Sequence, residues 1–437
     1  MPSPVAAFTV GDGSSLTVER SIPIAVQPEH KTPGGSIFLT SIDHVDHILV
    51  STVYCFERST ENAVDVVKQA LSKVLVHYYP LVGRLGKSSE GKLIVDCEKK
   101  LGVPFVEAVA NCDLDSLGDM SILHPDVLGK LVYTDSTTQN MPEIAPLLTA
   151  QVTKLKNGGL ILGIAFNHCM SDGISAIRFI NSWAEIARGE PLSVVPYHDR
   201  TILKPRMPPQ ICGPYDDFVQ LSDESNMTAL YKKEQLVCRS FHFDSEKLAA
   251  VKKMATACGQ GKRSITSFVA LAALVWRTRS MALKMKPHQQ TMLTLPVDFR
   301  SKLSPPVPDG YFGNAVVFPC CLCTAGELID EPISSTAERI IEAIERVNED
   351  YARSRIDYLD RYGFKEFSLG TLLVSSWTKL AFGSTDFGWG EPRQFGTGGL
   401  QTKSCLFLRG GRDNKDVVVV LELPFSAMNT FQELLQV

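Results

Sequence analysis

An unbroken apolar run is followed by a short polar stretch and then by an apolar pattern of helical spacing. Leu160 to Phe166 is hydrophobic at almost every position, which is typical of a buried strand. From Gly173 to Gly189 the apolar residues recur at intervals of three and four, at Ile174, Ile177, Ile180, Trp183, Ala184 and Ala187. We therefore expect a strand, a tight turn and an amphipathic helix in this order.

The same kinds of pattern predict further elements on both sides of a proline-rich segment. In the first half we expect strands at 52–56 and 92–96 and a helix at 62–78. In the second half the expected elements are a helix over 267–282, a strand over 291–297, a long helix over 334–354, a strand over 417–423 and a short helix over 427–435. Strands and helices alternate in both halves, so the predicted fold class is α/β with mixed sheets.

The proline-rich segment divides the chain. Prolines stand at positions 191, 196, 205, 208, 209 and 214, and they exclude long helices and central strands there. We predict an N-terminal domain over residues 1–190, a crossover linker over 191–223 and a C-terminal domain over 224–437.

His168 is the candidate for chemistry because it follows directly after the predicted strand. A neutral imidazole can take a proton from a hydroxyl or amine near pH 7, since its ordinary pKa of about 6.5 lies close to that pH. Asp172, four residues on, can hold the turn. From His168 and Asp172 alone, a catalytic role and an ordinary structural role are about equally well supported.

Composition excludes several classes of partner. The net charge is −4 over 437 residues, which provides no basic footprint for nucleic acid or an anionic membrane. The N-terminus lacks the features of a signal peptide, and no stretch approaches the roughly 20 apolar residues of a membrane span. We expect a cytoplasmic enzyme.

The 11 cysteines are odd in number and scattered, so a disulfide framework is not expected. Cys320, Cys321 and Cys323 form a cluster without further ligands at metal-binding spacing, and we interpret them as thiols of a core strand. Cys169 neighbours His168 in an extended chain and should point to the opposite side, so we do not expect it to be a nucleophile.

A second unusual string stands near the other end of the chain, Asp386-Phe-Gly-Trp389-Gly390. Two glycines around a tryptophan predict a turn, because glycine accepts backbone angles that other residues avoid. Such a turn can form the wall of a pocket.

Together these strings resemble a known family. His168-Cys-Met-Ser-Asp172-Gly and the tryptophan string occur in the order and at the separation found in plant BAHD acyl-CoA-dependent acyltransferases. Further matching strings are Leu71 to Leu85, Val297-Asp-Phe-Arg300 and Gly310-Tyr-Phe-Gly-Asn314. The resemblance implies two similar domains of the chloramphenicol acetyltransferase type, an acyl-CoA co-substrate, no permanently bound cofactor and a monomer.

The resemblance also implies roles at the site. His168 would be the general base of a direct transfer without an acyl-enzyme, and Trp389 would donate its indole N–H to the developing oxyanion. Asp172 would be structural and pair with Arg300, while Asp386 and Gly390 would be scaffold residues of their turn.

A cationic segment precedes the predicted helix at 267–282 and matches family segments that line the CoA site. It contains Lys262, Arg263, Ser264, Thr266 and Ser267. Two positive charges, hydroxyls and a helix N-terminus favour phosphate groups. A solvated loop with a Ser/Thr helix cap is the alternative.

The first half looks most like hydroxycinnamoyl transferases that esterify omega-hydroxy fatty acids and fatty alcohols. Thr32 and Ser375 resemble acceptor-pocket positions of such enzymes, and Phe299 stands where the family usually has glycine, which would reshape that pocket. Formation of an amide from a polyamine or cyclic amine, and an aliphatic or benzoyl donor, remain alternatives. So do a condensation domain of peptide assembly lines and a catalytically silent binding protein on the same fold.

Overall fold

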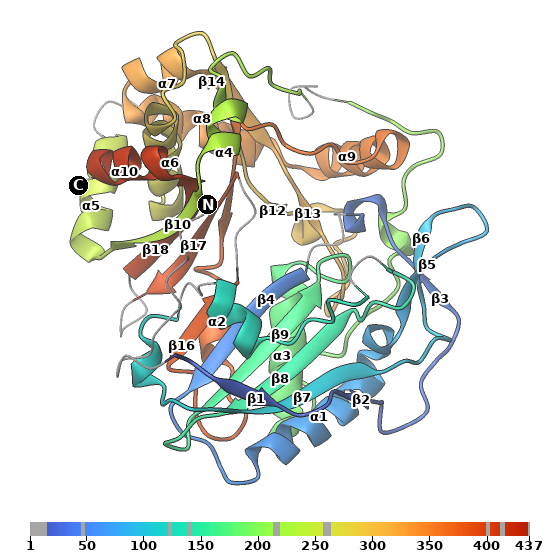
Figure 1. Ribbon diagram of the computed structural model, residues 1–437. Coiled ribbons are helices and arrows are strands. Elements are labelled where there is room, and N and C mark those ends of the chain that lie inside the picture. The colour runs from blue at the N-terminus through green and yellow to red at the C-terminus, as the bar shows by residue number, and fades with distance from the viewer. Residues whose placement is uncertain are drawn as a thin grey trace. The chain divides into compact units, whose positions relative to one another are not determined.

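The protein is described here from a computed structural model, which covers residues 15–44, 49–120, 125–138, 141–212, 219–256, 264–398, 403–410 and 416–435. The chain forms two compact units (Figure 1). Unit 1 comprises Met1–Pro205, Val307–Ala315 and Leu380–Gly399, and unit 2 comprises Arg206–Pro306, Val316–Lys379 and Leu400–Val437. Unit 1 therefore includes two segments that the sequence division assigned to the C-terminal half.

Unit 1 is built on a mixed sheet. Its strands follow the order β1 (Val18–Arg20), β7 (Val103–Ala110), β8 (Leu148–Lys154), β9 (Leu160–Asn167), β4 (Leu49–Phe56) and β16 (Gln394–Thr397), with β2 (Ile24–Val26) also on β7. β7 and β8 are parallel, and the remaining pairs are antiparallel. A smaller sheet contains β3 (Ser36–Phe38), β6 (Leu93–Asp96) and β5 (Arg84–Lys87).

The helices of unit 1 are α1 (Ala63–His77), α2 (Pro125–Leu131) and α3 (Gly173–Ala187), with short 3-10 turns at Ser41–Asp43, Tyr79–Val82, Asp115–Leu117, Thr201–Leu203 and Phe382–Ser384. Successive side chains of β9 point to opposite faces of the sheet, so each face of the strand contacts a different helix. Phe166 lies against Phe179 of α3, with ring centroids 5.9 Å apart, whereas Ile161 and Ala165 belong to a core that includes Leu131 of α2. Both faces of β9 are covered, which explains its unbroken apolar sequence.

Unit 2 contains the second mixed sheet. Its strand order is β10 (Leu236–Phe243), β18 (Asp416–Pro424), β17 (Ser404–Gly410), β15 (Thr371–Ser376), β11 (Gln290–Thr294) and β14 (Cys320–Thr324). A two-stranded ladder pairs β12 (Val297–Asp298) with β13 (Val316–Val317). The helices are α4 (Met227–Lys233), α5 (Ser245–Thr256), α6 (Ser267–Ala282), α7 (Ala325–Asp330), α8 (Ile333–Glu345), α9 (Glu349–Tyr362) and α10 (Phe425–Leu434), and a 3-10 turn spans Arg300–Lys302.

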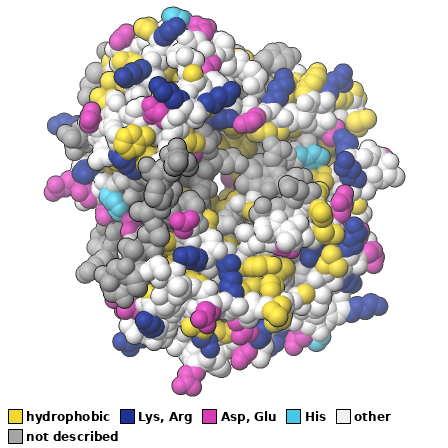
Figure 2. Space-filling model, in the orientation of Figure 1, with side chains coloured by type: hydrophobic (Ala, Val, Ile, Leu, Met, Phe, Trp, Pro, Cys, Tyr) yellow, Lys and Arg dark blue, Asp and Glu magenta, His cyan; other side chains and the backbone are white. Residues whose placement is uncertain are grey.

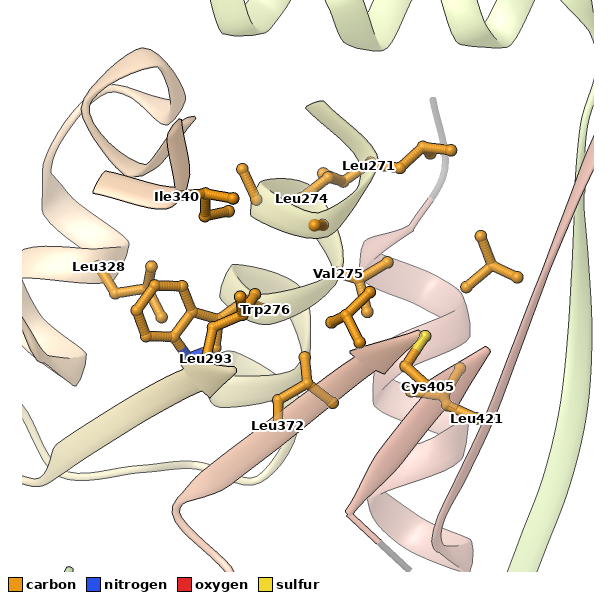
Figure 3. Packing of buried hydrophobic residues seen from close by; sticks show 14 of the residues in the cluster. Leu271, Leu274, Val275, Trp276, Leu293, Leu328, Ile340, Leu372, Cys405 and Leu421 are labelled. Atoms are coloured by element: carbon orange, nitrogen blue, oxygen red, sulfur yellow. The ribbon is translucent and has the colours of Figure 1, made fainter. Parts of the chain in front are cut away.

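The core of unit 2 surrounds α6. Figure 3 shows Leu271, Leu274, Val275 and Trp276 of this helix among side chains from the sheet and from the neighbouring helices. The Trp276 side chain is fully buried, and its Nε1–H donates to Thr291 Oγ1 at 2.9 Å. On the visible face of the molecule, basic and acidic side chains are interspersed (Figure 2).

Two mixed sheets with helices confirm the predicted α/β class, and most predicted elements are present within a few residues of their expected bounds. The single long helix predicted over 334–354 is wrong. The chain forms α8 and α9 instead, because Asn348 adopts an extended conformation and its side chain accepts the N–H of Tyr351, which starts a new helix. The strand predicted over 291–297 is likewise divided between β11 and β12.

Candidate active site

His168 lies immediately after the last residue of β9, and α3 begins five residues further on. The turn between them is built by Asn167, whose carbonyl accepts the N–H of Met170 at 2.9 Å and whose side chain accepts the N–H of Cys169 at 3.0 Å. The predicted strand, turn and helix are confirmed at this place. The histidine is therefore held at a strand end by a tightly bonded backbone.

Asp172 joins this turn to a distant segment of the chain. It is the N-cap of α3, and its Oδ1 accepts the N–H of Ser175 at 3.0 Å. Its Oδ2 accepts the N–H of Ala315 at 3.0 Å. The carboxylate thus satisfies two buried backbone donors, a scaffold role that is compatible with the sequence interpretation. The pairing of Asp172 with Arg300 stays a prediction; Arg300 Nη1 lies 2.8 Å from Asp298 Oδ1.

The segment that follows Tyr311 packs on the first turn of α3. The Ser175 hydroxyl lies 3.1 and 2.9 Å from the carbonyl oxygens of Tyr311 and Gly313, and it accepts the N–H of Gly313 at 3.2 Å. These bonds bring Asn314 to the turn that contains His168. Its Nδ2 donates to the carbonyl oxygen of His168 at 2.9 Å. The same nitrogen donates to Asp43 Oδ1 at 2.9 Å.

The imidazole of His168 is in an environment that favours its neutral form. Burial lowers its pKa, and this effect is opposed by the charge of Asp172, by hydrogen bonding to the residue's own backbone, by the charge of Asp43 and by hydrogen bonding to the Asn314 side chain. A lowered pKa leaves the ring uncharged at neutral pH. A neutral ring at a strand end can accept a proton from a substrate hydroxyl.

The structure places Trp389 far from His168. The rings of Trp389 and Phe56 have centroids 5.9 Å apart, and Phe56 pairs with Leu160 at the first residue of β9. His168 comes eight positions later, which at ~3.3 Å per residue corresponds to roughly 26 Å along the strand. The indole N–H cannot reach an oxyanion beside His168, so the predicted catalytic role of Trp389 is wrong.

The other contacts of the tryptophan turn agree with this separation. Arg188, at the C-terminal end of α3, donates to the carbonyl oxygen of Asp386, while His168 precedes the N-terminal end of the same helix. Fifteen residues of α-helix at ~1.5 Å each span about 22 Å. Asp386 Oδ1 accepts the N–H groups of Gly388 and Gly390 at 2.7 and 2.8 Å, so it closes its own turn.

The remaining predicted site residues are spread over the chain. Thr32 is buried and its carbonyl accepts Lys100 Nζ at 2.8 Å, Ser375 lies in β15, and Phe299 is fully buried. Their roles in an acceptor pocket stay predictions.

The proposed CoA segment is only partly described, since Lys262 and Arg263 lie outside the described residues. Ser264 is exposed, and Ser267 begins α6. Thr266 is the N-cap of α6 and accepts the N–H of Val269 at 3.3 Å, so the Ser/Thr cap of the alternative interpretation is present.

The sequence analysis gave no role to three buried residues beside the His168 turn: Asp43, Arg200 and Asn314. Asn314 belonged to a recognised string, but a string carries no information on which backbone group its side chain will contact. Asp43 and Arg200 had no sequence signal for this place, because the bonds that connect them to the turn and to Asn314 join residues 30 to 271 positions apart.

The described residues contain no group of three or more histidine, cysteine or carboxylate side chains suited to a metal ion. The ten cysteines within the described ranges form no disulfide with one another, and Cys320, Cys321 and Cys323 are buried in β14. Burial raises the pKa of Cys323 to about 12, so this thiol stays protonated. No helix among the described residues has the length and apolar character needed to cross a bilayer.

Comparison with known proteins identifies the family. The model of the Transferase family matches residues 16–436. The chain belongs to this family of BAHD acyltransferases. Among BAHD relatives, it is 47% identical to omega-hydroxypalmitate O-feruloyl transferase of Arabidopsis thaliana, over 97% of this chain and 93% of the relative. It is 44% identical to fatty alcohol:caffeoyl-CoA acyltransferase of the same plant, over 98% of this chain and the whole relative. The protein is thus an acyltransferase, as predicted.

Solved structures support the BAHD fold. The crystal structure of vinorine synthase aligns with a TM-score of 0.74 at 22% identity and covers 95% of this chain and 96% of that one. TRI101 of F. graminearum, crystallised with ethyl coenzyme A, aligns with a TM-score of 0.72 at 17% identity over 92% of this chain and 97% of that one. At these identities the likeness concerns the fold.

Proposed function

We propose that this BAHD acyltransferase transfers a hydroxycinnamoyl group from CoA to the hydroxyl of a long-chain fatty alcohol or omega-hydroxy fatty acid, with His168 as general base. The observation that carries the catalytic part is the position of His168: its half-buried imidazole follows β9, its backbone carbonyl accepts from Asn314 Nδ2 at 2.9 Å, and its pKa is lowered by desolvation. The names of the two Arabidopsis relatives, at 47% and 44% identity over almost the full chain, support the substrate class.

The proposed reaction needs a single proton carrier. His168 takes the proton of the acceptor hydroxyl as its oxygen attacks the thioester carbonyl, and a tetrahedral intermediate with a negative oxygen forms. The carbon–sulfur bond then breaks, and the imidazolium returns the proton to the departing CoA thiolate. The products are an ester and free CoA, and the enzyme returns to its initial state. General-base help of this kind contributes about 10²- to 10⁴-fold.

Binding of CoA is proposed for the segment from Lys262 to Ser267. The N-terminus of the 16-residue helix α6 follows this segment, and such an end with nearby cations favours phosphate groups. Thr32, Ser375 and Phe299 are kept as the proposed lining of the acceptor pocket. Trp389 has no part in this proposal, because it lies at the other end of β9.

The decisive experiment compares the purified full-length protein with its His168→Ala variant. Feruloyl-CoA and caffeoyl-CoA would be offered with a 16-carbon omega-hydroxy acid, fatty alcohols and a matched set of amines, while CoA thiol release and product mass are followed. We expect esters of the hydroxyl acceptors and a loss of at least about 10²-fold in kcat for the variant. His30→Ala removes an exposed imidazole, 76% accessible, and serves as the matched control.

Each competing function predicts a different result. Amide products formed in preference to esters would establish an N-acyltransferase. Binding of acyl-CoA without thiol release for any acceptor would indicate a catalytically silent protein. If His168→Ala released CoA as fast as the wild type, the general-base assignment would be lost.

A further inference from the structure

The backbone after β9 presents three consecutive carbonyl groups that the sheet does not use, and side chains from distant segments bind all three. The His168 oxygen accepts from Asn314 Nδ2 at 2.9 Å. The Cys169 oxygen accepts from Arg200 Nη1 at 3.1 Å, and the Met170 oxygen accepts from Arg200 Nη2 at 2.7 Å. Buried carbonyls need partners, but partners on three successive residues also leave the peptide planes little freedom to rotate.

Asp43 connects the two side chains that bind these carbonyls. Its Oδ2 lies 3.0 Å from Arg200 Nη1, in an ion pair whose side chains are 1% and 0% exposed. Its Oδ1 accepts from Asn314 Nδ2 at 2.9 Å and from the Asn314 backbone N–H at 3.2 Å. The N–H and hydroxyl of Thr40 bind Oδ2 at 2.7 and 2.9 Å, so both oxygens of the carboxylate have fixed partners.

We infer that Asp43, Arg200 and Asn314 form a positioning clamp that fixes the backbone of the His168 turn and so sets the orientation of the catalytic imidazole. This inference rests on the proposed role of His168 as the base. The three residues act through the backbone of the turn. They are positioning residues in this sense, whereas His168 is the catalytic residue.

The orientation of the imidazole matters because a general base must lie within hydrogen-bonding distance of the proton that it removes. The carbonyl of His168 fixes the peptide plane from which its side chain projects, and a misplacement of about 1 Å at a reacting group can cost ~10²-fold in rate. The guanidinium of Arg200 is well suited to the task, since its planar fork reaches two carbonyls and a carboxylate together.

Substitutions in a purely structural cluster and substitutions in a positioning clamp should have different effects on catalysis. Loss of any buried hydrogen-bonded amide should lower stability, wherever it lies. A clamp on the base should in addition lower kcat without a matching rise in KM and should alter the pH profile. The charged groups facing the imidazole are the carboxylates of Asp172 at the start of α3 and Asp43 in the 3-10 turn, with Arg200 bound to the adjacent carbonyls.

The chain offers a closely matched control in Gln151 of β8. This side chain is also fully buried, and its Nε2 donates to one backbone carbonyl, Lys130 at 2.8 Å, and to one side chain, Thr153 at 3.0 Å. Its Oε1 also accepts from Arg20 Nε at 2.8 Å. Gln151→Ala therefore removes the two kinds of bond that Asn314→Ala removes and one bond more, and none of the lost bonds involves the His168 turn.

The experiment measures kcat, KM for both substrates, the pH profile of kcat and the thermal midpoint for full-length wild type, Asn314→Ala and Gln151→Ala. We expect Gln151→Ala to lose at least as much thermal stability as Asn314→Ala, because its lost bonds include one to a charged guanidinium. Asn314→Ala should lose at least ~10-fold more kcat than Gln151→Ala, with KM within about threefold of the wild type. The acid limb of its pH profile should move to lower pH, because the Asn314 side chain, whose hydrogen bonding raises the pKa of His168, is gone.

Arg200→Lys provides a second test if Asn314→Ala does not fold. It keeps the positive charge next to Asp43 but replaces the fork with a single ammonium, so kcat should again fall by at least ~10-fold at unchanged KM. If the Asn314 or Arg200 variant matches Gln151→Ala in kcat and pH profile, the clamp is refuted. A wild type without activity, or an active His168→Ala variant, would instead refute the proposed function, so the two failures can be told apart.

Discussion

At the scale of single residues, the carboxylate of Asp172 stabilises two separate segments of the chain. Each of its carboxylate oxygens accepts a different backbone N–H at 3.0 Å, one in the first turn of α3 and one at Ala315. The side chain is 4% exposed, so water is a poor substitute for these bonds. The start of α3 and the segment that carries Asn314 therefore depend on the same carboxylate.

Replacing Asp172 by alanine should lower stability as well as activity. The helix loses its cap, worth about 0.5–2 kcal/mol, and the N–H of Ala315 loses its acceptor in a buried place, worth about 1–3 kcal/mol. We expect a total of about 2–4 kcal/mol, measured as a lower denaturant midpoint of the full chain. Asp172→Asn keeps one acceptor oxygen and should lose about half as much.

Ser171→Ala is the control for this prediction. The Ser171 hydroxyl is buried and has no hydrogen-bond partner among the described residues. Its removal should leave the midpoint within about 0.5 kcal/mol of the wild type. A loss at Ser171 as large as that at Asp172 would contradict the role given to the carboxylate.

Site residues could be predicted from the sequence where their contacts lie within a few positions along the chain, and could not where the contacts join distant segments. His168 and Asp172 are four residues apart, and the change from strand pattern to helix pattern places them in one turn. Asp43 and Asn314 are 271 positions apart, and no local pattern can pair them. Trp389 was misassigned because a family string identifies a turn without giving its distance from the base.

At the scale of elements, a glycine in β9 allows α2 to approach the sheet closely. A Cβ atom on Gly163 would lie 2.1 Å from the carbonyl oxygen of Leu131, the last residue of α2. A backbone atom at that distance cannot yield as a flexible side chain would. The small residue in this otherwise bulky strand therefore has a packing reason.

Gly163→Ala should destabilise the protein, because α2 or β9 must shift to accept the methyl group. Overpacking of this kind costs about 1–3 kcal/mol, which would appear as a lower thermal midpoint. Gly129 lies within α2, is exposed, and would meet nothing within 4 Å after the same change. Gly129→Ala should raise stability by roughly 0.5–1 kcal/mol through helix propensity. Equal effects of the two substitutions would contradict the packing argument.

Periodicity predicted the elements well where one pattern ended before the next began. The helix over 267–282 has the bounds of α6 as predicted. The expected helix over 334–354 failed because apolar residues continue at helical spacing across the break between α8 and α9. The signal of the break was chemical, since Asn348 is followed by Glu349 and Asp350 and together they form a helix start.

At the scale of the whole molecule, the two units are discontinuous in sequence. The first unit takes in Val307–Ala315 and Leu380–Gly399, and β16 of the latter segment pairs with β4. A composition shift or a run of prolines can mark a continuous boundary, but it cannot show that a short later segment completes an earlier sheet. That information resides in long-range pairing such as Phe395 with Tyr54.

The acid stability of the folded chain should depend strongly on His198. Its ring lies against Tyr79 and Phe312, with centroids 5.1 and 5.8 Å away, and its Nε2 is 2.7 Å from the carbonyl oxygen of His77. Burial lowers the pKa of His198 to about 4, against a favourable bond to His77 and with a smaller contribution from the charge of Arg200. We expect the wild type to lose about 1–3 kcal/mol of stability between pH 6.5 and pH 4 through this group, measured by denaturant unfolding at a series of pH values.

The sign follows from the two protonation states. The unfolded chain takes up the proton near the ordinary histidine pKa of about 6.5, while the folded chain takes it up only near 4, so acid favours the unfolded state throughout this interval. His198→Phe keeps an aromatic ring but cannot bind the proton, and its stability should fall less steeply on acidification. Burial also lowers the pKa of His168, which leaves a residual slope in this variant. His30→Asn changes an imidazole that stays in solvent in both states and should retain the wild-type slope. An unchanged slope in His198→Phe would show that other groups govern unfolding in acid.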